Sequence, residues 1–222
     1  MNITIISVEG NIGSGKSTLL ENLKHHFKEN TSIVFLKEPV DEWAKIQDEQ
    51  GITMLEKFYT DQEKYSFPFQ MMAYVSRLKV LRDTLKQLRL MPEQKFVIIT
   101  ERSLCTDKMV FAQMLYDSGK IEYINFQIYL NWFDTFSEEF PVHKVIYVKT
   151  NPYICHDRIL QRAREGEDSI PLEYLQTCHT YHTNMLADPV FQNKLLLDGN
   201  IDIYKNKTII NEWIEEIERF II

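Results

Sequence analysis

A glycine-rich segment near the start of the chain has the residue types and spacing of a phosphate-binding loop. It reads Gly10-Asn11-Ile12-Gly13-Ser14-Gly15-Lys16-Ser17-Thr18 and matches the pattern G-x-x-x-x-G-K-[ST]. Glycines allow consecutive N–H groups to turn toward a phosphate, and the start of the following helix adds a partial positive charge. We expect Lys16 to reach the β- and γ-phosphates of a nucleoside triphosphate and the Ser17 hydroxyl to coordinate Mg²⁺. The alternative is a turn that only joins a strand to a helix; the apolar run before the segment and the helical pattern after it argue against that.

Two further apolar runs end in charged residues. Glu38 follows the second run and precedes Pro39, which favours an extended backbone, and Glu101-Arg102 follows the third run. Both carboxylates should lie beside the phosphate loop, because the carboxyl ends of parallel strands meet at the edge where open α/β sheets bind ligands. Phosphoryl transfer to a hydroxyl needs a carboxylate that takes the proton, and an arginine can stabilise the developing charge. The alternatives are a surface glutamate at position 38 and a buried Glu–Arg pair with a structural purpose only.

Short apolar runs alternate with long stretches of helical period along the whole chain. The runs predict strands at Ile3–Val8, Ile33–Lys37, Phe96–Thr100, Lys144–Lys149 and Lys194–Leu197. The intervening stretches predict helices at about 16–29, 53–90, 104–138, 152–164, 171–187 and 206–221, with a break in the third near Ser118-Gly119. This alternation predicts a single α/β domain over residues 1–222, with a parallel five-stranded sheet covered by helices on both faces.

Composition excludes several classes of protein. A hydrophobic fraction of 44% is enough for a full core, which excludes a disordered chain. The 25 basic and 32 acidic residues argue against a partner that is a nucleic acid, because such a partner needs a basic face. No apolar run approaches the ~20 residues that span a membrane, and the strand-like run at Ile3 leaves no room for a signal peptide. Three scattered cysteines favour a reducing compartment, so we expect a cytoplasmic protein without membrane contact.

Further motifs separate this chain from other phosphate-loop proteins. The N-K-x-D motif of guanine-specific switches is absent, whereas Glu-Pro-Val-x-x-Trp at 38–43, Phe69-Gln70, Glu101-Arg102-Ser103 and Arg-Ala-Arg-Glu-Gly-Glu-Asp-Ser-Ile-Pro-Leu-Glu-Tyr-Leu at 162–175 occur in order. With these motifs the chain resembles the deoxycytidine, deoxyguanosine and deoxyadenosine kinase family over about residues 3 to 200. The resemblance implies a P-loop kinase fold with a helical lid at about 158–170, ATP as phosphate donor, Mg²⁺ and a deoxynucleoside substrate. It also implies a homodimer formed through parts of 53–90 and 121–138.

The resemblance assigns roles at the strand ends. Glu38 takes the proton of the sugar 5′-hydroxyl, and Arg102 faces the transferring phosphate and the 5′-oxygen. Glu101 is expected to coordinate Mg²⁺ through water alongside Ser17. Lys16, together with an arginine of the lid, completes the catalytic set.

The lid motif carries three arginines. Arg158 and Arg162 lie four residues apart and Arg164 follows, a spacing of like charges that is unfavourable unless an anion intervenes. The resemblance makes that anion the γ-phosphate of ATP, with Arg162 in the catalytic set. It also assigns Glu167 and Tyr59 to the sugar 3′-hydroxyl. By composition alone, a solvated helix end with acidic partners would be the favoured interpretation.

A predicted helix over 66–90 places Gln70, Ala73 and Arg77 on one face. A glutamine amide can pair with the edge of cytosine or adenine through a donor and an acceptor. Flat walls for the base would come from three aromatic residues, although such residues more often belong to the core: Trp43, Phe69 and Phe111. The resemblance implies that Arg77 and Asp107, where thymidine-using relatives carry smaller or apolar residues, disfavour thymidine relative to deoxycytidine and purine deoxynucleosides.

Three other interpretations remain open at this point. A nucleoside monophosphate kinase of the thymidylate kinase type shares the loop, sheet and lid, but Glu38 would repel an acceptor phosphate. A non-catalytic nucleotide-binding member would not need the intact Lys16, Ser17 and Glu101. The cysteines and histidines at 155–156 and 178–182 lack the spacing of a zinc site and are better explained by helix packing.

Overall fold

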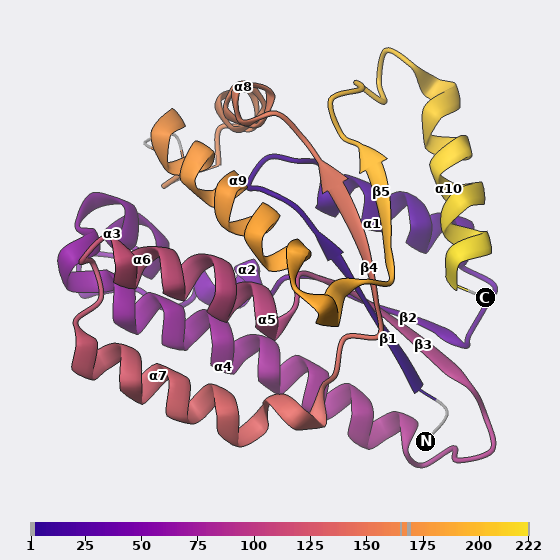
Figure 1. The fold of residues 1–222 in the computed structure, drawn as a ribbon, viewed down its shortest axis with the longest axis horizontal. Helices are drawn as coiled ribbons and strands as arrows, with labels where there is room; N and C mark the ends of the chain where they lie inside the picture. Colours follow the sequence, from indigo (N-terminus) through magenta and orange to yellow (C-terminus); the bar gives the residue numbers. More distant parts are fainter. Residues whose placement is uncertain (1–2, 165, 168–169, 222) are drawn as a thin grey trace.

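A five-stranded parallel sheet forms the centre of the computed structural model, which describes residues 3–164, 166–167 and 170–221 (Figure 1). Its strands are β1 (Ile3–Glu9), β2 (Ile33–Leu36), β3 (Phe96–Glu101), β4 (Lys144–Lys149) and β5 (Lys194–Asp198). Their order in the sheet is β2-β3-β1-β4-β5. The five predicted strands are confirmed, each to within one residue at its carboxyl end. The fold is the P-loop kinase fold that the sequence predicts.

Helices occupy most of the connections between the strands. They are α1 (Lys16–His26), α2 (Val40–Trp43), α3 (Met54–Thr60), α4 (Gln62–Leu88), α5 (Leu104–Thr106), η1 (Asp107–Ala112), α6 (Gln113–Asp117), α7 (Tyr123–Phe136), η2 (Ser137–Glu139), α8 (Pro152–Arg162), α9 (Leu172–Ala187), η3 (Pro189–Phe191) and α10 (Lys207–Ile221). The predicted break near Ser118-Gly119 is confirmed, since α6 ends just before it. Segment η1 is a π-helix, a rare form often found at functional sites.

The single helix predicted over 53–90 is wrong, because two helices occupy this stretch. Thr53 begins α3 with a capping box, in which its side chain accepts from the Glu56 N–H and Glu56 accepts from the Thr53 N–H. Asp61 then separates α3 from α4, and its carboxylate accepts a hydrogen bond from the Lys64 N–H at 3.2 Å. An aspartate that caps a new helix in this way gives the chain room to change direction.

The two faces of the sheet bury alternate residues of the strands. Ile5 and Ile98 belong to the core cluster formed with α4 and α7, whereas Ile6 and Ile99 belong to the cluster formed with α1 and α10. This is the period of two expected for strands covered on both sides. Figure 1 shows α4, α7 and α9 on one side of the sheet and α1 and α10 on the other.

Register between neighbouring strands brings the predicted chemical groups to one edge. Val8 of β1 pairs with Glu101 of β3, so the phosphate loop and the Glu101-Arg102 pair begin at the same level. Leu36 of β2 pairs with Thr100, which places Glu38 just beyond that level. In the described part of the chain no helix is both long and apolar enough to cross a membrane.

Candidate active site

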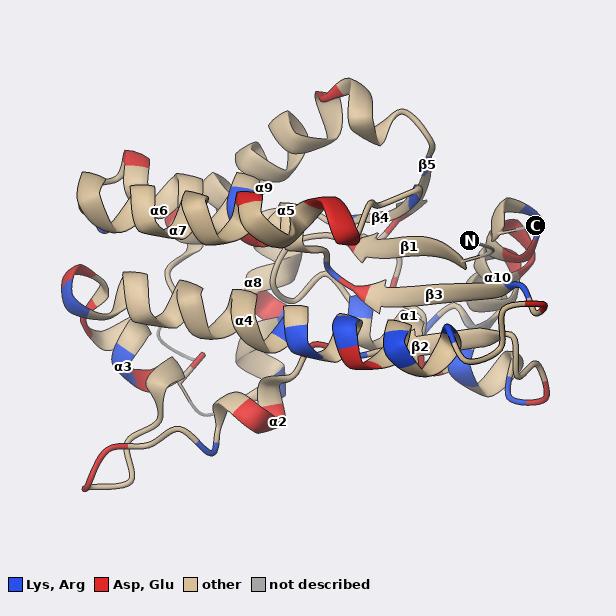
Figure 2. Cartoon of the chain, turned by 90° about the horizontal axis from the view of Figure 1, so that it is seen from below, with Lys and Arg blue, Asp and Glu red and all other residues tan. Residues whose placement is uncertain are grey.

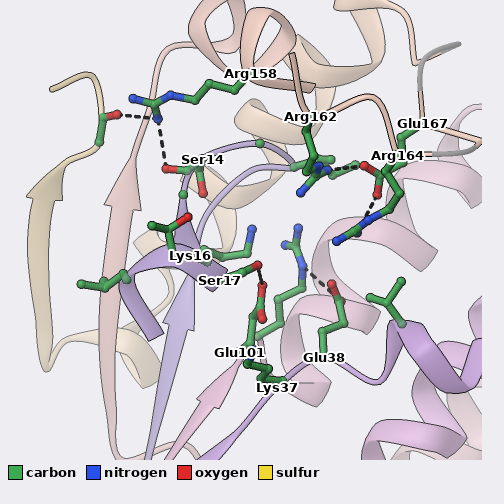
Figure 3. A pocket seen from close by; sticks show the side chains of 18 of the residues that line it. Ser14, Lys16, Ser17, Lys37, Glu38, Glu101, Arg158, Arg162, Arg164 and Glu167 are labelled. Carbon is green, nitrogen blue, oxygen red and sulfur yellow. Dashed lines mark hydrogen bonds and ion pairs between the residues drawn. The ribbon is translucent and has the colours of Figure 1, made fainter. Parts of the chain in front are cut away.

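A cavity of about 880 Å³ opens at the carboxyl ends of β1, β2 and β3, where ligands of open α/β sheets bind. The phosphate loop and the start of α1 form one wall, α8 and the segment after it form a second, and residues of α2, α3 and α4 form a third. Figure 3 shows Lys16, Ser17, Glu38 and Glu101 converging on this space. The geometry therefore brings the phosphate loop and both predicted carboxylates together.

Lys16 is buried at the base of the cavity. Its ammonium donates to the Asn11 carbonyl oxygen at 2.7 Å. Burial, and next the positive charge of Arg102, lower its pKa to about 8, although the Glu101 and Glu38 carboxylates oppose the shift. A group in this state gains from an incoming anion, which would restore its full charge. The position is therefore prepared for phosphate.

Ser17 and Glu101 meet across the boundary between α1 and β3. The Ser17 hydroxyl donates to Oε1 of Glu101 at 2.6 Å, and Glu101 is 5% exposed (Figure 3). A hydroxyl and a single carboxylate are oxygen ligands of the kind that Mg²⁺ accepts together with substrate phosphates and water. Among the described residues no group of three His, Cys, Asp or Glu side chains could form a protein-only metal site. The donor set present here fits Mg²⁺ carried by a nucleotide.

Glu38 lies between two arginines. Its Oε1 accepts a hydrogen bond from Arg77 Nη2 at 2.8 Å and lies 3.4 Å from Arg102 Nε. Burial alone would raise the pKa of Glu38, but the charges of Arg102, Arg77 and Lys16 outweigh it and lower the pKa below its usual value. Glu38 is therefore an ionised carboxylate at neutral pH and can accept a proton.

Arg77 forms the base of this network beneath the cavity. Its guanidinium donates to Asp107 Oδ2 at 2.8 Å and Oδ1 at 3.3 Å, and to the Glu101 carbonyl oxygen at 2.6 Å. Burial alone would lower the pKa of Arg77, but the charges of Asp107 and Glu38 and the hydrogen bonds raise it above its usual value. Arg77 therefore remains charged and fixes two carboxylates relative to β3.

Arg102 is held in an unusual backbone conformation. Its φ of 64° lies in the left-handed region, which a residue with a side chain rarely adopts. Its Nη1 donates to the Gly10 carbonyl oxygen at 2.9 Å, and its guanidinium carbon lies 4.8 Å from the centre of the Phe111 ring. The side chain is 4% exposed and lines the cavity. This buried, fixed cation lies close to Glu38 and the phosphate loop.

Aromatic side chains line the wall beyond Glu38. The Phe58 and Phe69 rings stack with centres 4.4 Å apart, and the Trp43 ring meets Phe69 edge-on at 5.7 Å. Gln70 lies among them, 2% exposed, and lines the cavity with Asp107. The cavity here has an apolar, aromatic wall with the polar side chains of Gln70 and Asp107 in its lining, which is typical of a site for an aromatic ring system.

The arginines of the predicted lid point in different directions. Arg162 and Arg164 both pair with Glu167, Arg164 through Nη1 at 3.0 Å from Oε1 (Figure 3). Arg158 instead donates to the Gly199 carbonyl oxygen at 2.9 Å and lies 3.4 Å from the Ser14 carbonyl oxygen. All three line the cavity. Residues 165 and 168–169 of the predicted lid, which spans 158–170, lie outside the described residues.

Tyr59 and Glu167 line the same part of the cavity. Burial, and next the negative charge of Glu167, raise the pKa of the Tyr59 hydroxyl well above its usual value. The phenol is therefore neutral and keeps its proton for hydrogen bonding. The two groups lie close enough for the charge of Glu167 to act on Tyr59, and their joint binding of a sugar hydroxyl stays a prediction.

Comparison with known proteins agrees with this geometry. A family model described as deoxynucleoside kinase matches residues 6–222. The chain belongs to the deoxynucleoside kinase family. It is 34% identical to a probable deoxycytidine kinase of fowlpox virus over 186 residues, which cover 82% of this chain and 72% of that protein. It is 32% identical to deoxycytidine kinase 2 of Gallus gallus over 242 aligned residues (97% and 89%) and 29% identical to the mitochondrial deoxyguanosine kinase of Xenopus laevis over 244 (100% and 91%).

Most site residues predicted from the sequence of this deoxynucleoside kinase line the cavity. Three do not: Gly10, Asn11 and Arg77. Gly10 and Asn11 begin the phosphate loop and are buried, and the Asn11 side-chain amide donates to the Leu175 carbonyl oxygen at 2.8 Å. Arg77 contacts the cavity through Asp107 and Glu38.

Sequence reasoning missed part of the lining. The missed residues include Leu55, Phe58 and Tyr174, the segment 199–205, and Ile210 and Trp213. The segment 199–205 carries no recognisable motif, so only its place after β5, at the edge used by the other strands, could have indicated it. Sequence reasoning also missed His182, whose Nε2 lies 3.3 Å from Arg102 Nη1.

Proposed function

We propose that this kinase transfers the γ-phosphoryl group of Mg²⁺-bound ATP to the 5′-hydroxyl of deoxycytidine or of a purine deoxynucleoside, and that it uses thymidine poorly. The observation that carries the proposal is the position of Glu38: an ionised carboxylate in contact with a fixed arginine, in the same cavity as the phosphate loop. A hydroxyl bound between Glu38 and the loop has both a proton acceptor and a phosphoryl donor beside it.

The donor side of the reaction rests on the loop, Ser17, Glu101 and the lid. Loop N–H groups and Lys16 bind the phosphates, while Ser17 and Glu101 would hold Mg²⁺, which would supply positive charge that neutralises the phosphates. Arg162 and Arg164 exchange Glu167 for phosphate oxygens when ATP enters. Arg158 borders the space for the nucleotide. Its guanidinium donates hydrogen bonds to backbone carbonyl oxygens of the phosphate loop and of residues 199 and 201.

At the acceptor, Glu38 takes the proton of the 5′-hydroxyl as the oxygen attacks the γ-phosphorus. Arg102 lies beside Glu38 and stabilises the negative charge that spreads over the phosphoryl oxygens. Tyr59 and Glu167 hold the 3′-hydroxyl and fix the sugar. An acceptor that already carries a phosphate would bring its charge against Glu38, which disfavours a nucleoside monophosphate kinase.

The preference for particular nucleobases follows from Gln70 and Asp107, which line the cavity together with the aromatic side chains. The Gln70 amide pairs with the edge of cytosine or adenine through one donor and one acceptor. Asp107, fixed by Arg77, occupies the space that a 5-methyl group of thymine would need. Rejection of one methyl group amounts to about 1–3 kcal/mol, so slow use of thymidine is expected.

A competition assay with labelled ATP and the four deoxynucleosides tests the acceptor. We expect deoxycytidine or a purine deoxynucleoside to have the highest kcat/KM and thymidine the lowest. Faster phosphorylation of a deoxynucleoside monophosphate, or of thymidine, would contradict the proposal. Nucleotide binding without transfer to any deoxynucleoside would show a non-catalytic member of the family.

The Glu38→Gln variant tests the proton acceptor. Gln keeps the shape of the side chain but cannot take the proton, so kcat should fall by roughly 10² to 10⁴. The matched control is Glu42→Gln, since Glu42 lies on α2 near Glu38 but pairs only with Lys45 on the surface. Glu42→Gln should leave kcat unchanged, and wild-type turnover in Glu38→Gln would refute the assigned role.

A homodimer through α4 and α7 is the second part of the proposal. Three apolar side chains four residues apart on α7 are 43–64% exposed: Ile124, Ile128 and Trp132. Val75 of α4 is 48% exposed, and Figure 2 shows almost no charged residue along α7. Such a contiguous apolar face is typical of an interface. Sedimentation should give twice the chain mass for the wild type and a monomer for Ile128→Glu.

The proposed role is nucleotide salvage in the cytoplasm. The three cysteines are free thiols, which fits the reducing compartment that the sequence predicts. The proposal includes no nucleic-acid partner.

A further inference from the structure

The guanidinium of Arg102 is surrounded by four neighbours. Gly10 offers a carbonyl oxygen 2.9 Å from Nη1, Glu38 lies 3.4 Å from Nε, and the Phe111 ring faces the guanidinium carbon at 4.8 Å. The fourth neighbour is His182 of α9, whose Nε2 lies 3.3 Å from Nη1. His182 is fully buried and does not line the cavity, so it can affect the reaction only through neighbours such as Arg102 and Phe111, and Arg102 is the one within hydrogen-bond distance.

The partners of His182 determine which ring nitrogen carries the proton. Nδ1 lies 2.7 Å from the Cys178 carbonyl oxygen, which can only accept, so Nδ1 is the donor. Nε2 faces Arg102, and a guanidinium can only donate. Nε2 must therefore be the unprotonated acceptor. Both hydrogen bonds are satisfied by one neutral tautomer and by no other protonation state.

The surroundings of the ring hold it in that state. Burial, and next the positive charge of Arg102, lower the pKa of His182 well below its usual value. The ring lies between two aromatic side chains, parallel to Tyr147 at 6.5 Å and edge-on to Phe111 at 6.1 Å between centres. These contacts leave the imidazole no alternative orientation without loss of packing.

We propose that His182 is a positioning residue: as a neutral hydrogen-bond acceptor it fixes the guanidinium of Arg102 in the orientation that stabilises the transferring phosphoryl group. The inference rests on the role of Arg102 in the proposed function. A fixed orientation matters here because donors aimed at developing charge lower the barrier only when they need no rearrangement during the reaction. The left-handed backbone at Arg102 does not set the far end of a long side chain, so the orientation of the guanidinium depends on its contacts with Gly10, Glu38 and His182.

Two substitutions separate the acceptor from the bulk of the ring. His182→Leu keeps an apolar side chain of similar size and removes the acceptor, whereas His182→Gln restores an acceptor oxygen. Loss of a hydrogen bond to a charged group should lower kcat by roughly ten- to a hundredfold in His182→Leu, with the KM values for ATP and deoxynucleoside nearly unchanged. His182→Gln should recover most of that loss. Equal impairment of both variants, or a change in KM alone, would overturn the proposal.

A control variant on the same helix accounts for lost stability. Leu186→Ala removes core packing one turn further along α9 and has no contact with Arg102. It should lower the midpoint of thermal unfolding while kcat stays at the wild-type value. A loss of kcat in Leu186→Ala as large as that in His182→Leu would attribute the effect to stability and overturn the proposal.

A double-mutant cycle with Arg102→Lys distinguishes failure of this inference from failure of the proposed function. If His182 acts through the guanidinium, His182→Leu should have little further effect on kcat when Arg102 is already lysine. Normal kcat in Arg102→Lys would refute the role of Arg102 itself. Impaired Arg102→Lys with normal His182→Leu would refute the inference and leave the proposed function intact.

The tautomer can be measured in the wild-type protein, and a variant is needed only to assign the signal. ¹⁵N chemical shifts of the His182 ring at pH 7 should show a protonated Nδ1 and an unprotonated Nε2. In His182→Gln this ring signal disappears, which assigns it. A protonated Nε2 would overturn the proposal.

Discussion

The arginines around the cavity form two sets with opposite environments. Arg77 and Arg102, next to Glu38, have side chains only 3% and 4% exposed and contact several groups each. Arg162 and Arg164, in the lid, are 35% and 38% exposed and share one partner, Glu167. The first set is held by several buried contacts, and we propose that the second exchanges its carboxylate for phosphate. We therefore expect a rigid acceptor side and a lid that adapts.

Among these variants, Arg77→Met should have the largest effect on the free energy of unfolding. Arg77 belongs to the buried set of arginines. The substitution leaves Asp107 buried without its cation, so the free energy of unfolding should fall by about 3–5 kcal/mol. Urea unfolding followed by circular dichroism measures this loss. Lys86→Met, exposed on the same helix, is the control and should stay within about 0.5 kcal/mol of the wild type. If Arg77→Met lowers the free energy of unfolding no more than Lys86→Met does, the buried arginines stabilise the protein no more than the lid arginines do.

Arg102→Lys should act on catalysis more than on stability. A lysine keeps the charge but cannot reach Gly10, Glu38 and His182 together, so kcat should fall by roughly 10² to 10³, as when one charge-stabilising donor is removed. The KM for the deoxynucleoside should change little. Single-turnover kinetics would measure the chemical step directly; unchanged kcat with raised KM would place Arg102 in ground-state binding instead.

ATP affinity should depend on pH through Lys16. The pKa of the Lys16 ammonium is about 8 in the protein without ATP, and a bound phosphate raises that pKa. The protein therefore takes up a proton when it binds ATP. Affinity is then full below pH 8 and weakens as the pH rises above it, by at most about tenfold per pH unit. Titration calorimetry between pH 7 and 9.5 measures the trend. Lys16→Arg, whose charge persists throughout, should bind with little pH dependence; an equal slope in both proteins would exclude Lys16 as the cause.

Arg164→Gln should have the smallest effect on stability. Arg164 is partly exposed, so its ion pair with Glu167 contributes less than about 1 kcal/mol to the free energy of unfolding. The KM for ATP should nevertheless rise, because one phosphate contact of the closed lid is missing. Comparison of unfolding and KM in the same preparation tests the contrast with Arg77. A stability loss near that of Arg77→Met would show that the lid is as rigid as the acceptor side.

The sequence predicted the elements whose signals are local. Five strands and the phosphate loop follow from continuous apolar runs and from a motif of eight neighbouring residues. The division at Asp61 was missed although it had a local signal: Thr53-x-x-Glu56 is a capping box, and Asp61 is a good N-cap residue. The short helix α2 had none, since four residues do not complete two turns.

The contacts that could not be predicted join distant parts of the chain. His182 lies 80 residues from Arg102 in the sequence. Its contact with Arg102 depends on an orientation of the imidazole ring that is set only by packing in the folded protein. The stacked pair of Phe58 and Phe69 likewise requires α3 and α4 to be folded against each other. Glu38, by contrast, could be placed near the phosphate loop because strand topology decides which ends share an edge.

The close approach of Gly13 to α8 ties the start of the predicted lid to the phosphate loop. A Cβ at Gly13 would lie 2.5 Å from the Cys155 carbonyl oxygen, so the first turn of α8 rests directly on the phosphate loop. Arg158 ties the next turn to Ser14 and Gly199. The first left-handed residue after these anchors is Ala163, with φ of 47°. The contacts therefore fix the first two turns of α8 on the phosphate loop, and the helix ends just before Ala163, beyond the last of these anchors.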